Sequence, residues 1–177
     1  MLNRKVVVYI AMSLDGYIAR ENGSIDWLLE NSPADPEEYG YSNFLQTIDT
    51  VIMGKATYDQ LWELSDSFPY EGKKCYVFSR TTSGRDEYVE FVNEEIGPFV
   101  EKLKSQPGAN IWLVGGSELI KGFMEADAVD EFMIAVIPVL IGKGIPLFQK
   151  NNRETRLKLK NDFRFGDCIM LNYEVER

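Results

Sequence analysis

The segment IWLVGGSELI, residues 111–120, contains the most informative pattern in the chain. Its apolar first half is typical of a buried β-strand, and residues 117–126 carry apolar side chains at helical spacing. A single glycine is enough to turn a chain from a strand into a helix. The second of two adjacent glycines, Gly115 and Gly116, therefore indicates that a group outside the chain approaches the backbone here.

The length and composition predict one α/β domain spanning residues 1–177, because 177 residues with 45% hydrophobic content suffice for one sizeable core. The formal net charge of -9 argues against nucleic acid or an anionic membrane as a partner, since both require clustered Lys and Arg. A small phosphorylated ligand needs only a few local cations. We therefore expect a small-molecule ligand.

The sequence also favours a cytoplasmic protein without a membrane partner. No stretch approaches the about 20 apolar residues of a membrane helix, and residues 6–12, the apolar run near the start, suit a short buried strand better than a signal peptide. Cys75 and Cys168 have no C-x-x-C partner, which is typical of packed thiols in a reducing compartment.

The chain contains no histidine. This excludes Ser-His-Asp and Cys-His catalysis, His-ligated zinc and a zinc deaminase centre. We expect no metal site. Carboxylates, tyrosines, lysines or a bound cofactor must carry any proton or hydride transfer.

Strand and helix patterns alternate over the first two thirds of the chain, which predicts a mostly parallel sheet with helices on both faces. The expected strands are residues 6–12, 50–53, 74–79, 89–92 and 110–114, and the expected helices are residues 36–48, 55–64, 98–105 and 117–126. The C-terminal third differs. Residues 131–139, 156–163 and 168–175 follow one another without a helix, so we expect antiparallel strands that close one edge of the sheet.

Ligands of such sheets bind at the carboxyl ends of the strands, where helix N-termini present free N–H groups. Three segments end a strand in this way: Gly115-Gly116-Ser117, Gly54-Lys55-Ala56-Thr57 and Ser79-Arg80. Each has a plainer interpretation, as a tight connection, a solvated helix charge or a surface loop. Neither the phosphate loop nor the G-x-G-x-x-G pattern is present, so only their combination indicates a dinucleotide site.

The combination resembles a known superfamily. The ordered stretches are AMSLDGYIA (residues 11–19) with Trp27 after it, DTVIMGKATYDQLW (49–62), YVFSRT (76–81), IWLVGGSELI and VDEFMIAVIPVLIGKGIPLF (129–148). Together they resemble the dihydrofolate reductase superfamily and, more narrowly, the reductase domain of riboflavin-biosynthesis deaminase/reductases, the RibD C-terminal domain, and its stand-alone bacterial relatives.

The resemblance implies a dihydrofolate reductase-like mixed sheet and an NADPH-dependent oxidoreductase. Its substrate would be a small heterocycle or a ribosylamino-pyrimidine, as in 5-amino-6-(5-phosphoribosylamino)uracil reductases. Dihydrofolate reductase activity and a non-catalytic dinucleotide-binding protein are the alternatives, with a purely structural interaction module third. The resemblance further implies a homodimer and a cis peptide bond between Gly115 and Gly116.

Carried over residue by residue, the resemblance implies two sets of site residues. The cofactor would contact Ala11, Gly16, Ile18, Gly54, Lys55, Ala56, Thr57, Ser79, Arg80, Gly115, Gly116, Ser117, Glu118 and Leu119, with Ser79 and Arg80 at the 2′-phosphate that distinguishes NADPH from NADH. The substrate side would include Trp27, Tyr41 and Phe44, together with Tyr39. The family motif does not place a proton donor in this chain, and we expect Asp15, Asp26, Glu38, Glu37 or water to supply the proton.

Two positions depart from the family patterns. Dihydrofolate reductases carry an acidic residue one helical turn before a Phe of the Phe44 kind, whereas this chain has Gly40 there. Riboflavin-pathway reductases typically read E-G-G where this chain reads Val114-Gly115-Gly116. Both departures leave the substrate open.

Overall fold

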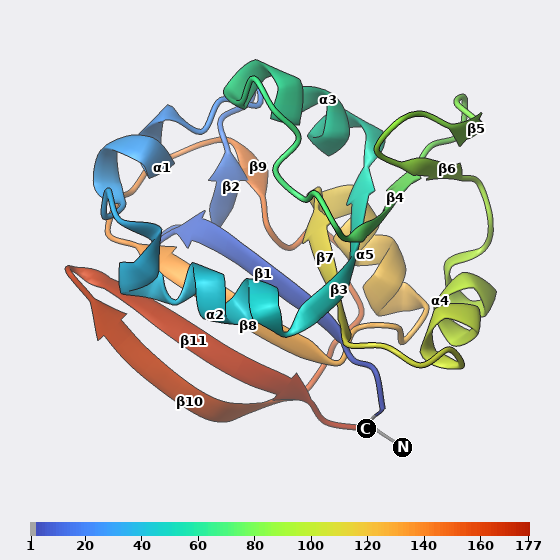
Figure 1. Cartoon of the computed structure of the whole chain (residues 1–177). Helices are drawn as coiled ribbons and strands as arrows, with labels where there is room; N and C mark the ends of the chain where they lie inside the picture. Colours follow the sequence, from blue (N-terminus) through green and yellow to red (C-terminus); the bar gives the residue numbers. More distant parts are fainter. Residues whose placement is uncertain (1–2) are drawn as a thin grey trace.

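The computed structural model describes residues 3–177 and contains a nine-stranded sheet (Figure 1). In sheet order the strands are β10 (Leu157–Phe165), β11 (Cys168–Val175), β8 (Glu131–Ile137), β1 (Val6–Ser13), β7 (Asn110–Gly115), β3 (Ile48–Gly54), β4 (Lys74–Phe78), β6 (Glu90–Val92) and β5 (Gly84–Arg85). Every pairing from β8 to β6 is parallel, whereas β11 and β10 at one edge and β5 at the other pair antiparallel. The predicted sheet is confirmed.

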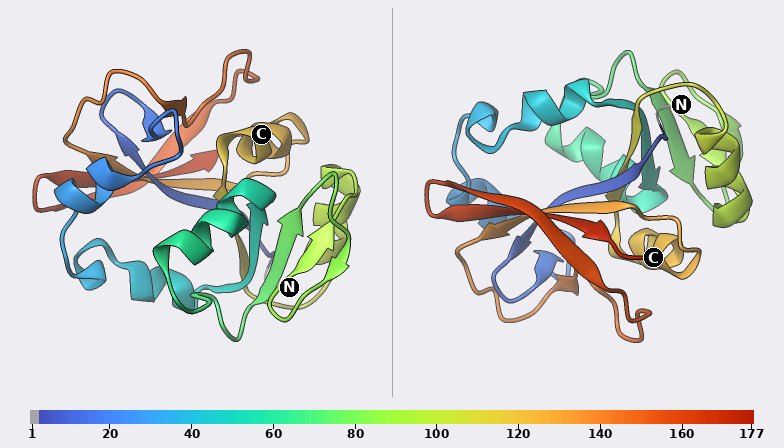
Figure 2. Two further views of the ribbon diagram at one scale, coloured as in Figure 1. Left: turned by 90° about the horizontal axis from the view of Figure 1, so that it is seen from above. Right: turned by 90° about the horizontal axis from the view of Figure 1, so that it is seen from below.

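Helices cover both faces of this sheet, as both views in Figure 2 show. They are α1 (Asp26–Asn31), α2 (Tyr41–Gln46), α3 (Lys55–Leu64), α4 (Ile96–Lys104) and α5 (Ser117–Glu125). The central strand β1 is buried on both sides because alternate side chains enter different cores. Val6 and Val8 pack with α4 and α5, and Val7 packs with α2 and α3. A third core cluster lies under α1, around Trp27.

The single helix expected over residues 36–48 is wrong. The structure has a 3-10 helix, η1 (Pro36–Tyr39), followed by α2, and residue 48 already belongs to β3. The break lies at Gly40, whose φ of 73° is left-handed and suits glycine. The aspartate before η1 caps it, since the Asp35 carboxylate accepts the Glu37 N–H at 2.9 Å.

A second, two-stranded sheet was not expected from the sequence. It pairs β2 (Tyr17–Ala19) with β9 (Ile145–Pro146) in antiparallel orientation. The Leu147 N–H also donates to the Gly16 carbonyl at 2.9 Å. This small sheet holds the loop after β1 against the segment that follows β8.

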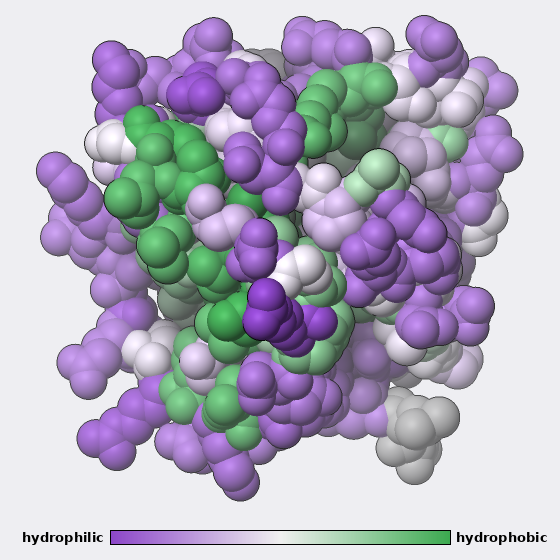
Figure 3. Space-filling view, turned by 90° about the vertical axis from the view of Figure 1, so that its left-hand side faces the viewer, coloured by the Kyte–Doolittle hydropathy of each residue, from purple (hydrophilic) through white to green (hydrophobic). Residues whose placement is uncertain are grey.

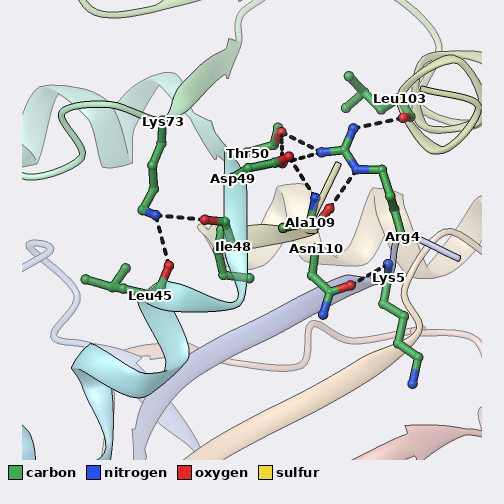
Figure 4. A network of polar contacts seen from close by, with 10 residues as sticks. All are labelled: Arg4, Lys5, Leu45, Ile48, Asp49, Thr50, Lys73, Leu103, Ala109 and Asn110. Atoms are coloured by element: carbon green, nitrogen blue, oxygen red, sulfur yellow. Dashed lines mark hydrogen bonds and ion pairs between the residues drawn. The ribbon is translucent and has the colours of Figure 1, made fainter. Parts of the chain in front are cut away.

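A buried arginine joins the amino ends of the central strands (Figure 4). The Arg4 guanidinium donates to the carbonyls of Leu103 and Ala109, at 3.0 and 2.7 Å, and to the Thr50 hydroxyl at 2.8 Å. It also pairs with the Asp49 carboxylate, whose other oxygen accepts the Ala109 N–H at 2.8 Å. This network lies at the opposite end of the strands from the predicted ligand site, so its role is structural.

The surface of the molecule carries apolar patches between polar residues on the side shown in Figure 3, where α1 and the β10–β11 turn lie in Figure 1. Leu14, Leu29 and Leu140 have the largest exposed fractions among the large hydrophobic residues. Within residues 3–177, no helix combines the length and the apolar character needed to cross a membrane.

Candidate functional site

Two helices begin side by side at the carboxyl ends of neighbouring strands. Strand β3 pairs with β7, so that Met53 lies opposite Gly115, and α3 and α5 start directly after these strands. A Cβ atom on Gly54 would lie 3.7 Å from the Gly115 carbonyl oxygen and 3.8 Å from the Gly116 nitrogen. Since α3 packs on one face of the sheet and α5 on the other, the two helix N-termini meet at its edge.

Neither N-terminus is capped by a side chain. Gly54 and Gly116 occupy the N-cap positions, and no side-chain hydrogen bond closes either first turn. The free N–H groups of these turns belong to residues named from the sequence, Lys55, Ala56, Thr57, Ser117, Glu118 and Leu119. A Cβ atom on Gly116 would lie 3.7 Å from the Thr57 hydroxyl, so the two turns adjoin. Such a double N-terminus attracts an anion.

The connection between β7 and α5 has the backbone that the resemblance implies. The peptide bond between Gly115 and Gly116 is cis. Gly115 has a φ of 131°, a conformation that residues with a Cβ rarely adopt, whereas the φ of Gly116 is -77°. Only Gly115 therefore requires glycine for its own conformation. At Gly116 the absence of a side chain instead allows another group to approach the backbone closely.

The two cations predicted for this site differ in their surroundings. The Lys55 ammonium lies 2.5 Å from the Asp59 carboxylate, four residues along α3. Arg80 follows β4 and is exposed, and among residues 3–177 no carboxylate lies within ion-pair distance of it. The Ser79 hydroxyl accepts the N–H groups of Thr81 and Thr82, at 3.3 and 3.0 Å. Ser79 thus shapes the turn that presents Arg80.

Strands β1 and β7 part at their carboxyl ends. Their pairing stops at Val8 opposite Leu113, while β1 continues along β8 as far as Ser13. The Tyr9 carbonyl, which no longer faces a strand partner in β7, accepts the Trp112 indole N–H at 3.1 Å. Ala11 lies beyond Val8, in the part of β1 that no longer pairs with β7. A ligand bound between these two strands could therefore contact Ala11.

Three further residues expected to contact the cofactor lie at or after the end of β1, namely Ala11 in β1, Gly16 in the loop that follows and Ile18 in β2. Gly16 is open, with no atom within 4 Å of a Cβ built on it, and its φ is 89°. Ile18 packs against the core beneath α5, whereas Ala11 packs on the opposite face with the cluster around Trp27. The structure therefore brings these three residues to the end of β1 but distributes them over both faces of the sheet.

The aromatic residues predicted for the substrate side belong to α1, η1 and α2. Phe44 stacks on Tyr9, with 4.1 Å between ring centroids, and Tyr41 packs against Tyr9 and Trp112. Trp27 belongs to the neighbouring cluster and is fully buried, and its indole N–H has no partner among the described residues. Phe44 and Trp27 therefore serve as core residues in this structure.

Sequence reasoning missed Tyr9 as the centre of this aromatic group. Its side chain contacts both Tyr41 and Phe44, and burial raises the pKa of the Tyr9 hydroxyl. A signal was present, because Tyr9 lies two residues before Ala11 and so shares its face of β1. It was hidden because an aromatic residue in an apolar strand is usually a core residue.

Two of the carboxylates proposed as proton donors, Asp15 and Asp26, are hydrogen-bond acceptors in the structure. Asp15 accepts the Ser13 hydroxyl at 2.6 Å and the Gly142 N–H at 2.8 Å, and these bonds lower its pKa. The Arg20 guanidinium, 2.6 Å away, lowers the pKa of Asp26 to about 2. Both are ionised at neutral pH, which argues against the interpretation of either as a proton donor. Glu38 is exposed in η1.

No group of three or more Cys, Asp or Glu side chains within residues 3–177 lies close enough together to hold a metal ion.

Comparison with known proteins places this geometry in a family. The model of the RibD C-terminal domain matches residues 4–171. The chain belongs to this family. It is 50% identical over 173 residues to the uncharacterized protein YwjB of Bacillus subtilis strain 168, covering 97% of this chain and 98% of that protein.

Solved structures confirm the fold. A putative riboflavin biosynthesis protein from Shewanella sp. PV-4 superposes with a TM-score of 0.88 at 26% identity, covering 98% of this chain and 99% of that one. Dihydrofolate reductase from Enterococcus faecalis, complexed with NADP(H) and RAB-propyl, superposes with a TM-score of 0.70 at 13% identity, covering 98% and 97%. The RibD C-terminal domain of this chain therefore has the dihydrofolate reductase-like fold.

Proposed function

We propose that this chain is an NADPH-dependent reductase that transfers hydride to a small heterocycle of the ribosylamino-pyrimidine type. The observation that carries the proposal is the meeting of two uncapped helix N-termini at Gly54 and Gly116. Membership of the RibD C-terminal domain family supports a reductase. The Shewanella structure, described as a putative riboflavin biosynthesis protein, supports the substrate class.

The residues present fit a phosphorylated dinucleotide. The free N–H groups of α3 and α5 would bind the diphosphate, and the bare backbone at Gly54 and Gly116 leaves it room. Arg80, exposed and unpaired among the described residues, would bind the 2′-phosphate. When bound, NADPH would supply the hydride.

The remaining chemistry asks the chain to orient the substrate, exclude water and leave a proton accessible. Tyr9 and Tyr41, which are partly exposed and pack with the buried Phe44, would provide an apolar wall on the side of the sheet where α2 lies. Burial raises the pKa of Tyr9 and Tyr41, and both hydroxyls are protonated at neutral pH. The Tyr9 hydroxyl donates to the Tyr39 carbonyl at 3.4 Å, which leaves the Tyr41 hydroxyl to donate to a substrate. Because Asp15 and Asp26 are ionised, we propose water as the proton source.

The test is a comparison of binding with turnover. Purified protein is titrated with NADPH and NADH, and NADPH oxidation is then followed with ribosylaminopyrimidines, pterins and dihydrofolate. We expect NADPH to bind more tightly and to be oxidised only with a ribosylaminopyrimidine. Oxidation with dihydrofolate alone would make the protein a dihydrofolate reductase, and tight binding without oxidation would make it a non-catalytic dinucleotide-binding protein. Absence of binding would overturn the proposal altogether.

A further inference from the structure

Gln149 contacts the start of α5 from a distant part of the chain. Its side-chain Nε2 donates to the Ser117 hydroxyl oxygen at 2.6 Å, across 32 positions of sequence. Ser117 is the first residue of α5 and is buried. The bond therefore joins the segment after β9 to the helix whose N-terminus forms half of the candidate dinucleotide site.

The polarity of this bond decides what the Ser117 hydroxyl can do. A hydroxyl has one hydrogen to donate and two lone pairs that accept. An amide NH₂ group only donates, so Gln149 occupies a lone pair of Ser117 and leaves the hydroxyl hydrogen available. A free hydrogen beside the uncapped N–H groups of α5 adds a donor for an anion. A free lone pair at the same place would repel that anion.

The backbone around Gln149 is well held. Leu147, two residues earlier, is buried and donates its N–H to the Gly16 carbonyl. The turn that follows closes with the Asn152 N–H donating to the Gln149 carbonyl at 3.3 Å. Lys121, one helical turn beyond Ser117, donates to the Lys150 carbonyl at 3.5 Å. These contacts hold the Gln149 amide against α5.

We propose that Gln149 is a positioning residue for the dinucleotide site, holding the Ser117 hydroxyl so that its hydrogen is directed to a phosphate oxygen of the cofactor. The proposal rests on the proposed function, since it concerns the same site. The competing explanation is that the bond has a purely structural role and only tethers the turn at residues 149–152 to α5. The two roles differ in whether the effect of Gln149 depends on the Ser117 hydroxyl.

A double-mutant cycle separates the two roles. NADPH dissociation constants are measured for the wild type, Gln149→Met, Ser117→Ala and the double variant, with unfolding midpoints recorded beside them. We expect Gln149→Met and Ser117→Ala each to weaken NADPH binding about fivefold, the value of one ordinary hydrogen bond. In the Ser117→Ala background, Gln149→Met should weaken binding no further. Gln106→Met, at an exposed glutamine that follows α4, is the matched control and should bind as the wild type does.

Gln149→Glu provides a second variant. Its carboxylate would accept the Ser117 hydrogen and add negative charge beside the phosphates, so we expect a loss larger than that of Gln149→Met. Wild-type affinity in Gln149→Met, or an equal loss in both Ser117 backgrounds, would leave only a tether and overturn the inference while the proposed function stands. A wild type that does not bind NADPH would overturn both.

Discussion

Gly54 lies against Gly116 where β3 and β7 end, so that a methyl group on Gly54 would sit 3.8 Å from the Gly116 nitrogen. That distance is ordinary van der Waals contact, and the φ of -80° and ψ of 161° at Gly54 suit any residue. Neither crowding within the chain nor backbone conformation therefore explains the glycine. We propose that a ligand approaches this surface.

The first prediction follows from this contact. Gly54→Ala should leave the unfolding midpoint nearly unchanged but weaken NADPH binding about tenfold or more, a loss of at least about 1.4 kcal/mol, because the methyl group would occupy the space of the diphosphate. Isothermal titration and thermal unfolding measure the two effects.

Gly97→Ala in α4 is the control, since a Cβ there meets open space. Gly122 is unsuitable, because its Cβ would lie 2.8 Å from the Ile96 Cδ1 atom. Unchanged affinity in Gly54→Ala would contradict the assignment.

A second prediction concerns the choice between NADPH and NADH. Because Lys55 is paired with Asp59 whereas Arg80 is free of carboxylates within the described chain, Arg80 should carry most of the preference. Arg80→Ala should lower NADPH affinity about tenfold or more, the value of a charge-assisted hydrogen bond, and leave NADH affinity unchanged. Lys55→Ala is the matched variant and should change the ratio of the two dissociation constants less. An equal loss for both cofactors would refute the role of Arg80.

The large elements of this fold could be predicted because each has a local pattern. Helix α3 begins after a glycine and carries apolar residues on one face, and the structure gives it the expected bounds, Lys55–Leu64. Strands β2 and β9 could not be predicted, because two or three residues are too short to show a period. Gly40 is apparent in the sequence as a possible break, but no local pattern distinguishes a glycine within a helix from one that separates two helices.

Some residues of the candidate site could likewise be predicted from the sequence, whereas others could not. The glycines and first-turn residues of α3 and α5 follow strands directly, so sequence order was enough to name them. The bond from Gln149 to Ser117 joins residues 32 positions apart, and no local pattern marks either partner. The pairing of Lys55 with Asp59 could have been predicted, because opposite charges four residues apart on a helix face each other. The lowered pKa of Asp26 depends on Arg20, which a loop brings back to it.

A third prediction concerns acid stability. Arg20 holds the pKa of Asp26 at about 2 in the folded protein, against about 3.9 for an unfolded aspartate. A lowered folded-state pKa stabilises the fold above the unfolded value, and the stabilisation disappears as the pH falls through the folded value. The difference in unfolding midpoint between wild type and Asp26→Asn should therefore be constant above about pH 5 and shrink between about pH 4 and pH 2. Glu101→Gln, an exposed substitution on α4, serves as control. A difference that persists at pH 2 would show that Asp26 acts by packing.

The homodimer expected from the sequence stays a prediction. Strand β10 forms one edge of the sheet, and Leu157 and Leu159 on it are exposed opposite Val175 and Tyr173 of β11. An uncovered edge with apolar side chains favours pairing with a second copy.

Light scattering should give about twice the 20.3 kDa of one chain, and Leu159→Glu should return the mass to that of the monomer. Leu64→Glu, at the exposed end of α3, should leave the dimer intact. A wild-type mass near 20.3 kDa would contradict the prediction.

The last prediction tests the network at the opposite end of the strands. The Arg4 side chain is 3% exposed and the Asp49 side chain 41%, so the two partners of this ion pair differ in their burial. Arg4→Met leaves the carbonyls of Leu103 and Ala109 without a donor and should lower the free energy of unfolding by about 3 kcal/mol, as expected when a buried pair is broken. Asp49→Asn should cost about 1 kcal/mol, because the Arg4 guanidinium keeps its bonds to Leu103, Ala109 and Thr50 and the amide oxygen at position 49 still accepts a hydrogen bond. Lys5→Met is the matched control and should cost less than about 1 kcal/mol, since the Lys5 side chain is 42% exposed and its buried partner Glu131 keeps a second ion pair with Lys160. Urea unfolding of the four proteins gives these values, and equal effects for Arg4→Met and Lys5→Met would show that the network does not hold the amino ends of β1, β3 and β7 together.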